Sequence, residues 1–503
     1  MPVLPLLARA EAHGTATALR CSAGTLCYDD LLVGARLVAA ALLDGGTDLA
    51  EARVAFLVPP REQYVHTQWG IWLAGGVAVP LSGAATAKEL AYAVSDSQAA
   101  ILVTTRDRAE SVQPIVAATH ARLLVLEDLP HHGVTALPEI SPDRRGMMLY
   151  TSGTTSTPKG VVTTHGCIQS QIESLVHAWQ WQADDRIPLF LPLHHIHGII
   201  NVLGCGLWTG AAIEMFPRFD VPTIFERVAA DAYTLFMAVP TIYVKMIEAL
   251  HAMPPEQATP VVSGFAKMRL MVSGSAALPA RVHEEWTALT SQKLLERYGM
   301  TEIGMAISNP YDGERRPGAV GQPLPGVEVC LRNEAHQPID AENVAGEIHV
   351  RGPTVFLEYW NRPEATRDAF VDGWFRTGDI AVVEDGSYRI MGRSSVDIIK
   401  SGGYKLSALE IEASLLDHPA ITQCAVVGLP DNTWGETVAA AVVLAEGESL
   451  DLESLHAWCR DRLSPYKMPR TLLAVEDLPR NAMGKVTKPA VSRLFAGDSS
   501  NVE

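Results

Sequence analysis

The sequence lacks a long apolar run and a paired-cysteine motif. Its best apolar stretch, near Gly198–Gly210, is rich in glycine and shorter than the ~18–20 residues that a membrane span needs. The seven cysteines are scattered without a CxxC pair, so neither a disulfide framework nor a cysteine-based zinc site is indicated. The N-terminus has no basic segment followed by a cleavage site. We therefore expect a soluble, cytoplasmic protein without a membrane partner.

Positive charge is also scarce. The chain has 40 Lys and Arg against 57 Asp and Glu, which gives a formal net charge of −17. Nucleic acid and anionic lipid are bound through clustered Lys and Arg, so this balance argues against both as partners. An anionic substrate would have to meet local positive groups.

The order of apolar runs predicts the fold class. At 503 residues the chain has room for about two or three folding units. Short apolar runs alternate with helical periodicity from Arg53 onward, which predicts a large N-terminal domain of layered α/β sheets, largely parallel. The expected strands are Val54–Val58, Ile101–Thr104, Leu123–Leu126, Met147–Thr151, Leu189–Pro192, Thr234–Val239 and Leu270–Ser273, and the expected helices include Thr241–His251 and Ala280–Leu289.

The pattern of turn residues and apolar runs changes twice after Gly318. Gly/Pro turns and alternating strands up to Asp379 predict a small β subdomain. Beyond Gly392–Gly403 a separate α+β pattern begins, and we place a hinge near Ser394–Val396. The expected domains are residues 1–393 and 394–503. The elements expected in these parts are strands Val327–Arg332, Gly346–Arg351, Ala425–Leu429 and Val438–Leu444, and helices Ser407–Leu416 and Leu452–Leu463.

One loop has the chemistry of phosphate binding. Leu149–Gly160 reads LYTSGTTSTPKG, an apolar strand followed by hydroxyl residues, glycine and a lysine. Such hydroxyls and backbone N–H groups can surround phosphate oxygens. It is not a Walker A loop, because Lys159 is followed by glycine and the required spacing is absent. Taken alone, the loop could equally be an ordinary turn.

The string YTSGTTSTPKG resembles the signature loop of the adenylate-forming superfamily, which includes acyl-CoA synthetases, luciferases and the adenylation domains of peptide synthetases. Ser156 stands where that family usually has glycine. The resemblance implies ATP as cofactor, with Thr154 also contacting Mg²⁺. The loop residues that it assigns to ATP are Thr151, Ser152, Gly153, Thr154, Thr155 and Lys159.

Further strings resemble the family's motifs, in the family's order. Gly274-Ser275-Ala276 is similar to the segment along adenine. Tyr298-Gly299-Met300-Thr301-Glu302 is similar to the block in which the tyrosine lies near adenine, the threonine touches the α-phosphate and the glutamate holds Mg²⁺. A carboxylate suits that ion, which prefers oxygen ligands. The bland alternative for Glu302 is a carboxylate at a helix start.

The C-terminal motifs complete the series. Asp379, in the string FRTGD, resembles the residue that accepts hydrogen bonds from both ribose hydroxyls, with Arg393 close by. Lys485, in PRNAMGK, resembles the catalytic lysine. Taken alone, Lys485 would be an ordinary solvated lysine. Acetylation would remove its charge, so a lysine acetyltransferase is an expected partner.

The resemblance implies an ATP-dependent acid–thiol ligase. The acid attacks ATP to form an acyl-adenylate, and the acyl group then passes to coenzyme A. The small C-terminal domain is expected to be mobile: it rotates about the hinge, withdraws Lys485 and presents a strand over Ile399–Tyr404 to the pantetheine arm. Gly402 and Gly403 suit that task because they carry no side chains.

Three histidines bear on the choice of acid. His194, His195 and His197 occur in LPLHHIHGI, and period-2 spacing on a strand end would place the last two on one face. A metal site is one interpretation, although cleft or core histidines are commoner. In the family, the position of His195 gates the acyl pocket.

The acid itself is predicted from a narrower resemblance. His197, Arg297 and the turn that begins at Ser273 resemble malonyl-CoA synthetases. An arginine fork suits the second carboxylate of a dicarboxylate, so malonate is the expected acid, with methylmalonate as an alternative. Arg297 could instead pair with Glu296 or another structural carboxylate.

Three other functions stay open from the sequence. The chain could be a short- or medium-chain fatty acyl-CoA synthetase, an adenylating enzyme that loads a carrier protein, or a catalytically silent nucleotide-binding scaffold. Retention of Glu302, Asp379 and Lys485 together argues against the last.

Overall fold

A seven-stranded sheet organises the first part of the chain. The computed structural model describes residues 4–129, 136–151, 158–402, 404–480 and 486–496. The strand order is β19-β8-β7-β4-β3-β5-β6, parallel from β7 to β6 and antiparallel at β8 and β19. Its elements are β3 (Arg53–Leu57), β4 (Val77–Pro80), β5 (Ile101–Thr104), β6 (Arg122–Val125), β7 (Arg145–Thr151), β8 (Lys159–Thr164) and β19 (Glu358–Tyr359), with helices α2 (Tyr28–Leu43), α3 (Glu62–Leu73), α4 (Ala87–Asp96), α5 (Arg106–Thr119), α6 (His165–Ala178) and the short η1 (Leu126–Asp128). Every residue of β4 and β5 is buried, as a parallel sheet covered on both faces requires.

Two further sheets complete the N-terminal body. A five-stranded sheet has the order β11-β12-β13-β14-β15, and a four-stranded sheet has the order β2-β1-β10-β9. The elements of the first are β11 (Leu235–Ala238), β12 (Leu270–Ser273), β13 (Leu295–Met300), β14 (Gly304–Ser308) and β15 (Gln322–Pro323), with α8 (Val221–Ala229), α9 (Pro240–Ala252), α10 (Pro255–Ala266) and α11 (Ala280–Thr290). Those of the second are β1 (Thr17–Cys21), β2 (Gly24–Cys27), β9 (Arg186–Leu189) and β10 (Ala212–Met215), with α1 (Pro5–His13), the π-helix η2 (His197–Gly204) and α7 (Cys205–Thr209).

An antiparallel β subdomain follows. It contains β16 to β18 and β20 to β22, and all its strand pairs are antiparallel. Its elements are β16 (Glu328–Arg332), β17 (Pro338–Ile339), β18 (Gly346–Arg351), α12 (Pro363–Asp368), β20 (Phe370–Val371), β21 (Trp374–Glu384) and β22 (Ser387–Arg393).

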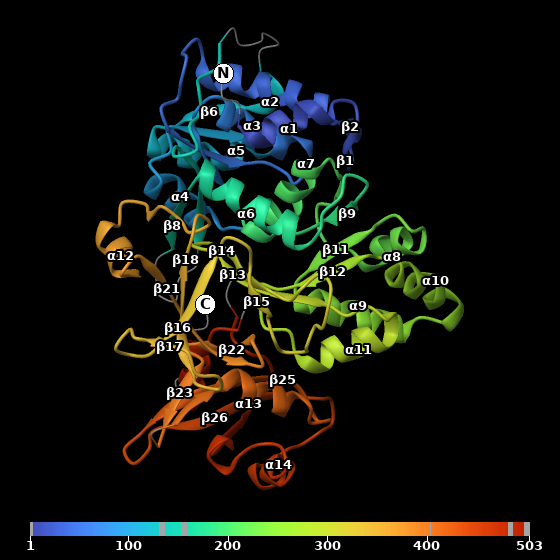
Figure 1. The fold of residues 1–503 in the computed structure, drawn as a ribbon, viewed down its shortest axis with the longest axis vertical. Helices are drawn as coiled ribbons and strands as arrows, with labels where there is room; N and C mark the ends of the chain where they lie inside the picture. Colours follow the sequence, from blue (N-terminus) through green and yellow to red (C-terminus); the bar gives the residue numbers. More distant parts are fainter. Residues whose placement is uncertain (1–3, 130–135, 152–157, 403, 481–485, 497–503) are drawn as a thin grey trace.

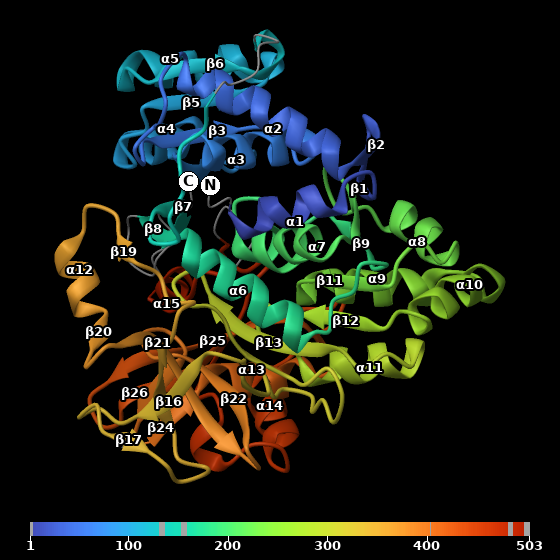
Figure 2. The same cartoon turned by 45° about the horizontal axis from the view of Figure 1, so that its top comes forward.

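The last part of the chain has its own sheet and its own core. Buried clusters around Ile411 and Val427 consist of residues that all follow position 398. The elements are β23 (Ile398–Ser401), β24 (Tyr404–Ser407), α13 (Ala408–Leu416), β25 (Ile421–Asp431), β26 (Gly435–Leu444), α14 (Leu452–Cys459), η3 (Pro465–Lys467), β27 (Thr471–Ala474) and α15 (Lys488–Phe495). In Figures 1 and 2 these elements lie at one end of the molecule, next to the β subdomain and opposite α2 and α5.

The expected fold class is confirmed, with mixed rather than purely parallel sheets. Strands β5, β12 and β18 have the predicted bounds. Helix α13 starts where the sequence indicates, because the Ser407 side chain accepts from the Glu410 N–H as an N-cap. No helix in the described part of the chain is long and apolar enough to cross a membrane. All seven cysteines are free in the structure.

Candidate active site

A buried arginine lies on β13 of the five-stranded sheet, next to the end of β12. Arg297, on β13, is 4% exposed. Its Nη2 donates to Ser275 Oγ at 3.1 Å, and that hydroxyl lies 3.2 Å from Nδ1 of His197 at the start of η2. Ser273, the last residue of β12, is fully buried, and its hydroxyl has no hydrogen-bond partner among the described residues. The three residues expected to contact the acid, Ser273, His197 and Arg297, thus all lie next to the turn that follows β12.

Gly274 makes this approach sterically feasible. A Cβ at Gly274 would lie 2.5 Å from the Cζ of Arg297, far inside van der Waals contact. The neighbouring Ala276 is exposed in the same turn. The glycine of this turn therefore makes room for the guanidinium.

Arg297 makes no ion pair in the described chain. Glu296, its neighbour in sequence, instead accepts from the backbone N–H of Gly318 at 3.1 Å. Among residues that the structure describes, no ion pair of Arg297 with a carboxylate is found, and its Nε is buried without a hydrogen-bond partner. The alternative of a structural pairing with Glu296 is therefore wrong. Burial lowers the pKa of Arg297, yet a guanidinium remains a cation at neutral pH.

The histidine segment differs from expectation. It is not a strand end, because β9 stops at Leu189; a turn follows, and His197 opens the π-helix η2. The period-2 argument for His195 and His197 is therefore wrong. The half-buried His195 packs against His194, with ring centroids 4.2 Å apart. Burial, reinforced by the charge of Arg297, keeps the pKa of His197 well below its usual range, so His197 is neutral.

Asn201 is a candidate that sequence reasoning missed. It lies four residues after His197 in η2 and is fully buried, and neither side-chain amide atom has a hydrogen-bond partner among the described residues. Buried amides are normally satisfied, and π-helical turns occur often at functional sites. The available signal was a single amide within the apolar run Gly198–Gly210.

Asp379 lies in a network of polar side chains. It is on β21, paired in register with Arg393 at the end of β22. Tyr298 donates to Asp379 Oδ2 at 2.6 Å, and Arg393 Nε donates to Oδ1 at 2.9 Å. Each carboxylate oxygen has a second lone pair, so both stay able to accept from a ribose. The role of Tyr298 beside adenine stays a prediction.

Glu302 is a buried carboxylate in the turn between β13 and β14. It is 6% exposed and accepts from the Tyr359 hydroxyl at 2.9 Å. Burial raises its pKa, although the Tyr359 hydrogen bond acts in the opposite direction. A divalent cation would offset that desolvation, so the donor fits Mg²⁺. Half-buried Thr301 precedes Glu302 in the turn, and Gly299 admits no side chain because a Cβ would lie 2.2 Å from Gly304 O.

The phosphate loop is held between β7 and β8. Thr151 ends β7 opposite Lys159, which begins β8. The Lys159 Nζ lies 4.8 Å from the ring centroid of Tyr359, the residue that contacts Glu302. Four predicted loop residues lie outside the described residues: Ser152, Gly153, Thr154 and Thr155.

The loop of Lys485 is closed at its base. Lys485 itself lies outside the described residues, but Arg480 and Val486 form an antiparallel bridge, and Thr487 N donates to Pro479 O at 2.8 Å. Lys488, which sequence reasoning missed, lies 2.7 Å from Asp397 Oδ1 and 2.8 Å from Glu412 Oε1.

The expected strand over Ile399–Tyr404 is a hairpin, because β23 ends at Ser401 and β24 begins at Tyr404. Gly402 forms its turn with φ +56°, and a Cβ there would lie 2.8 Å from the Trp434 ring. Gly403 lies outside the described residues. Upstream, residues 394–397 form a turn in which Asp397 N donates to Arg393 O at 2.8 Å.

Comparison with known families agrees with this geometry. Residues 6–360 match the family described as AMP-binding enzyme, and residues 410–485 match its C-terminal domain. The chain belongs to the AMP-binding enzyme family. The first match contains Arg297, Glu302 and Tyr298, and the second ends on Lys485.

Similar AMP-binding enzymes include malonate–CoA ligases. The chain is 46% identical to the mitochondrial malonate–CoA ligase of Homo sapiens, covering 90% of this chain and 84% of that protein. It is 41% identical to the malonate–CoA ligase of Arabidopsis thaliana, covering 90% and 79%. ATP-bound MatB from Rhodopseudomonas palustris is 32% identical with a TM-score of 0.87, covering 98% and 99%, and its apo form has a TM-score of 0.80 at the same coverage.

Proposed function

We propose that this chain is an ATP-dependent malonate–CoA ligase, which forms malonyl-adenylate and then malonyl-CoA. The buried guanidinium of Arg297, without a carboxylate partner in the described chain, carries the proposal. An unpaired buried charge is costly unless a ligand of opposite charge completes it. The similarity to malonate–CoA ligases of two organisms supports the same acid.

In the first half-reaction, one malonate carboxylate pairs with Arg297 and the other attacks the α-phosphorus of ATP. A carboxyl oxygen–phosphorus bond forms, and the bond to pyrophosphate breaks. Negative charge builds on the equatorial oxygens, so stabilisation of charge is the main catalytic effect. Thr301 and Lys485 are the groups that we assign to it. Glu302, with Thr154, would hold Mg²⁺, which would supply charge neutralisation to the phosphates.

Neutral His197 and Ser275 orient the guanidinium of Arg297 rather than compete for its charge. The Ser275 hydroxyl accepts from Arg297 and lies 3.2 Å from His197 Nδ1. Asp379 and Arg393 would hold the ribose, and His195 would border the acyl pocket. Gly274, Ala276 and Tyr298 would border the adenine.

In the second half-reaction, the thiol of coenzyme A attacks the acyl carbon and AMP leaves. We assign this step to an arrangement in which the C-terminal domain, residues 394–503, has turned relative to residues 1–393. The hairpin at Gly402 would then border the pantetheine arm, since a glycine lets a narrow chain pass close to backbone.

A panel of acids tests the proposal. Pyrophosphate release is measured with malonate, methylmalonate, acetate, butyrate and octanoate, with and without coenzyme A. We expect malonate to give the highest kcat/KM. For methylmalonate, the additional methyl group should weaken transition-state binding by ~1–3 kcal/mol. A preference for butyrate or octanoate would instead make the chain a fatty acyl-CoA synthetase. Release that needs a carrier protein in place of coenzyme A would make it a loading enzyme.

The compartment and the acetyltransferase stay predictions. We expect a cytoplasmic protein, although the similar human ligase is described as mitochondrial. Acetylation of Lys485 would remove the charge that adenylation needs. A preparation fully acetylated there should lose pyrophosphate release, and an unchanged rate would contradict this mode of control.

A further inference from the structure

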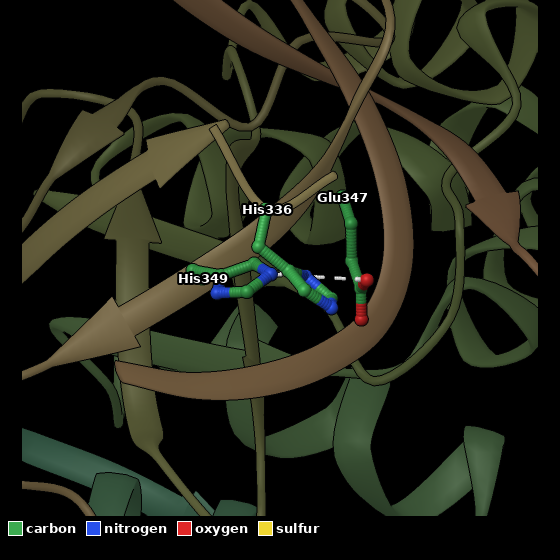
Figure 3. A group of neighbouring side chains, drawn as sticks. All are labelled: His336, Glu347 and His349. Carbon is green, nitrogen blue, oxygen red and sulfur yellow. Dashed lines mark ion pairs between the residues drawn. The ribbon is translucent and has the colours of Figure 1, made fainter. Parts of the chain in front are cut away.

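Three side chains with metal-binding chemistry meet in the β subdomain, outside the site described above. Glu347 and His349 are two residues apart on β18 and therefore project from the same face. His336 comes from the turn between β16 and β17, and Figure 3 shows its imidazole beside the side chains of Glu347 and His349. One ligand atom from each residue lies within 4.8 Å of the others. His349 Nε2 is 3.8 Å from Glu347 Oε2.

The burial of the histidines is an independent sign of a ligand. His349 is fully buried, and neither of its ring nitrogens has a hydrogen-bond partner among the described residues. The Nδ1 of half-buried His336 is likewise buried without a hydrogen-bond partner among the described residues. Buried polar atoms are normally satisfied, and a buried imidazole gains most from a metal ion that takes its lone pair. The cluster thus has unused donor capacity.

We propose that His336, Glu347 and His349 bind a divalent ion of the zinc class. Two imidazole nitrogens and one carboxylate oxygen suit Zn²⁺, whereas Mg²⁺ and Ca²⁺ prefer oxygen ligands throughout. Zinc bonds of ~2.0–2.2 Å place tetrahedral ligand atoms roughly 3.3 Å apart. To bind the ion, the side chains would have to close up to that spacing from separations of at most 4.8 Å. A water would take the fourth position.

Arg376 competes with the ion for Glu347. Its Nη2 lies 3.3 Å from Glu347 Oε2, while Oε1 accepts from the Gly378 N–H at 3.1 Å. An ion bound through Oε2 therefore replaces Arg376 and leaves the contact with Gly378 in place. Gly378 precedes Asp379, and its carbonyl accepts from Ser394 N at 2.8 Å. The ion would thus hold Glu347 in place, and Glu347 in turn supports the backbone at Gly378.

Zinc titration of the chelator-treated, full-length protein tests the site by calorimetry and by thermal melting. We expect wild type to bind one equivalent of Zn²⁺ and to gain thermal stability by mass action. His336→Ala changes a half-buried turn residue and should fold; it should bind at least about tenfold more weakly. Arg376→Gln removes the competing charge and should bind several-fold more tightly.

His177→Ala is the matched control, because His177 is exposed on α6. It should bind zinc as wild type does. Equal affinity in wild type and His336→Ala would place the ion elsewhere, for example on a cysteine, and would overturn the proposal. Absence of zinc binding by wild type would overturn it as well. Neither calorimetry nor thermal melting depends on ligase activity, so failure of the zinc proposal would not contradict the proposed function.

Discussion

At the scale of single residues, the proposed choice of acid rests on Arg297. A monocarboxylate with an alkyl chain would bury apolar atoms against an unpaired guanidinium, which is unfavourable. Malonate would supply the missing charge and would accept hydrogen bonds from the guanidinium. The side chains next to the Arg297 guanidinium, those of Ser275 and His197, are neutral. The positive charge of Arg297 would therefore be left for the substrate.

Arg297→Ala should reduce kcat/KM for malonate by roughly 30- to 5,000-fold, a loss of about 2–5 kcal/mol of transition-state stabilisation, because it removes one partner of a buried charge pair. The weak activity on acetate and the KM for ATP should change little. Arg315→Ala is a suitable control, since Arg315 contacts the backbone carbonyls of Pro310, Lys293 and Tyr311. Equal losses for malonate and acetate would make Arg297 merely structural.

Glu296 should give folding a pH dependence. Burial raises its pKa to about 8, against an ordinary value of 4.5. The folded chain therefore keeps a proton that the unfolded chain releases, so this contribution to stability is full below pH ~4.5 and is lost as pH rises through ~8. In denaturation between pH about 5 and 8, Glu296→Gln should gain stability relative to wild type as pH rises. A difference that is constant with pH would contradict this.

At the scale of elements, the turn after β12 determines how closely Arg297 approaches it. Gly274→Ala places a Cβ 2.5 Å from the Arg297 Cζ and should displace the guanidinium. We expect KM for malonate to rise at least about tenfold, and KM for ATP to rise by a smaller factor because the same turn would also border the adenine. Gly83→Ala is the control, because its nearest neighbour would be a side-chain atom at 3.6 Å. Unchanged malonate kinetics in Gly274→Ala would argue against this role of the turn.

Lys488 joins the segment after β22 to α13 by its contacts with Asp397 and Glu412. Its side chain is 12% exposed, so Lys488→Met leaves two buried carboxylates without their cation. We expect the free energy of unfolding of this part of the chain to fall by ~3–5 kcal/mol. The loss would be detected as faster hydrogen exchange in residues 408–444. Lys267→Met breaks an exposed pair with Asp231, 60% and 51% exposed, and should cost only ~0–1 kcal/mol. Equal costs would mean that the Lys488 contacts add nothing beyond a surface pair.

At the scale of the whole molecule, Lys485 in the C-terminal part of the chain is expected to act in only one of the two half-reactions. Lys485→Gln should slow malonate-dependent pyrophosphate release by about 10²–10³, while the conversion of synthetic malonyl-adenylate to malonyl-CoA should be largely kept. Arg462→Gln, which removes a charge elsewhere in the same domain, should affect neither step. Equal loss of both steps would contradict the assignment.

Much of the fold was predictable because its signals are local. Fully apolar runs such as Ile101–Thr104 mark buried strands, and Ser407 marks a helix start through its own side chain. The histidine segment was predicted wrongly because spacing alone does not distinguish a strand end from a turn entering a π-helix. The cluster around His349 was missed because its third member, His336, comes from another element.

The sequence by itself determined the family and the reaction class, because motif residues such as Asp379 and Glu302 occur in order along the chain. Tertiary structure alone decided which charges are paired. Arg297 lies beside Glu296 in sequence, yet packing turns the carboxylate to Gly318 and the guanidinium to Ser275. Neighbours along the chain set local conformation, whereas desolvation and pairing depend on residues that only folding brings together.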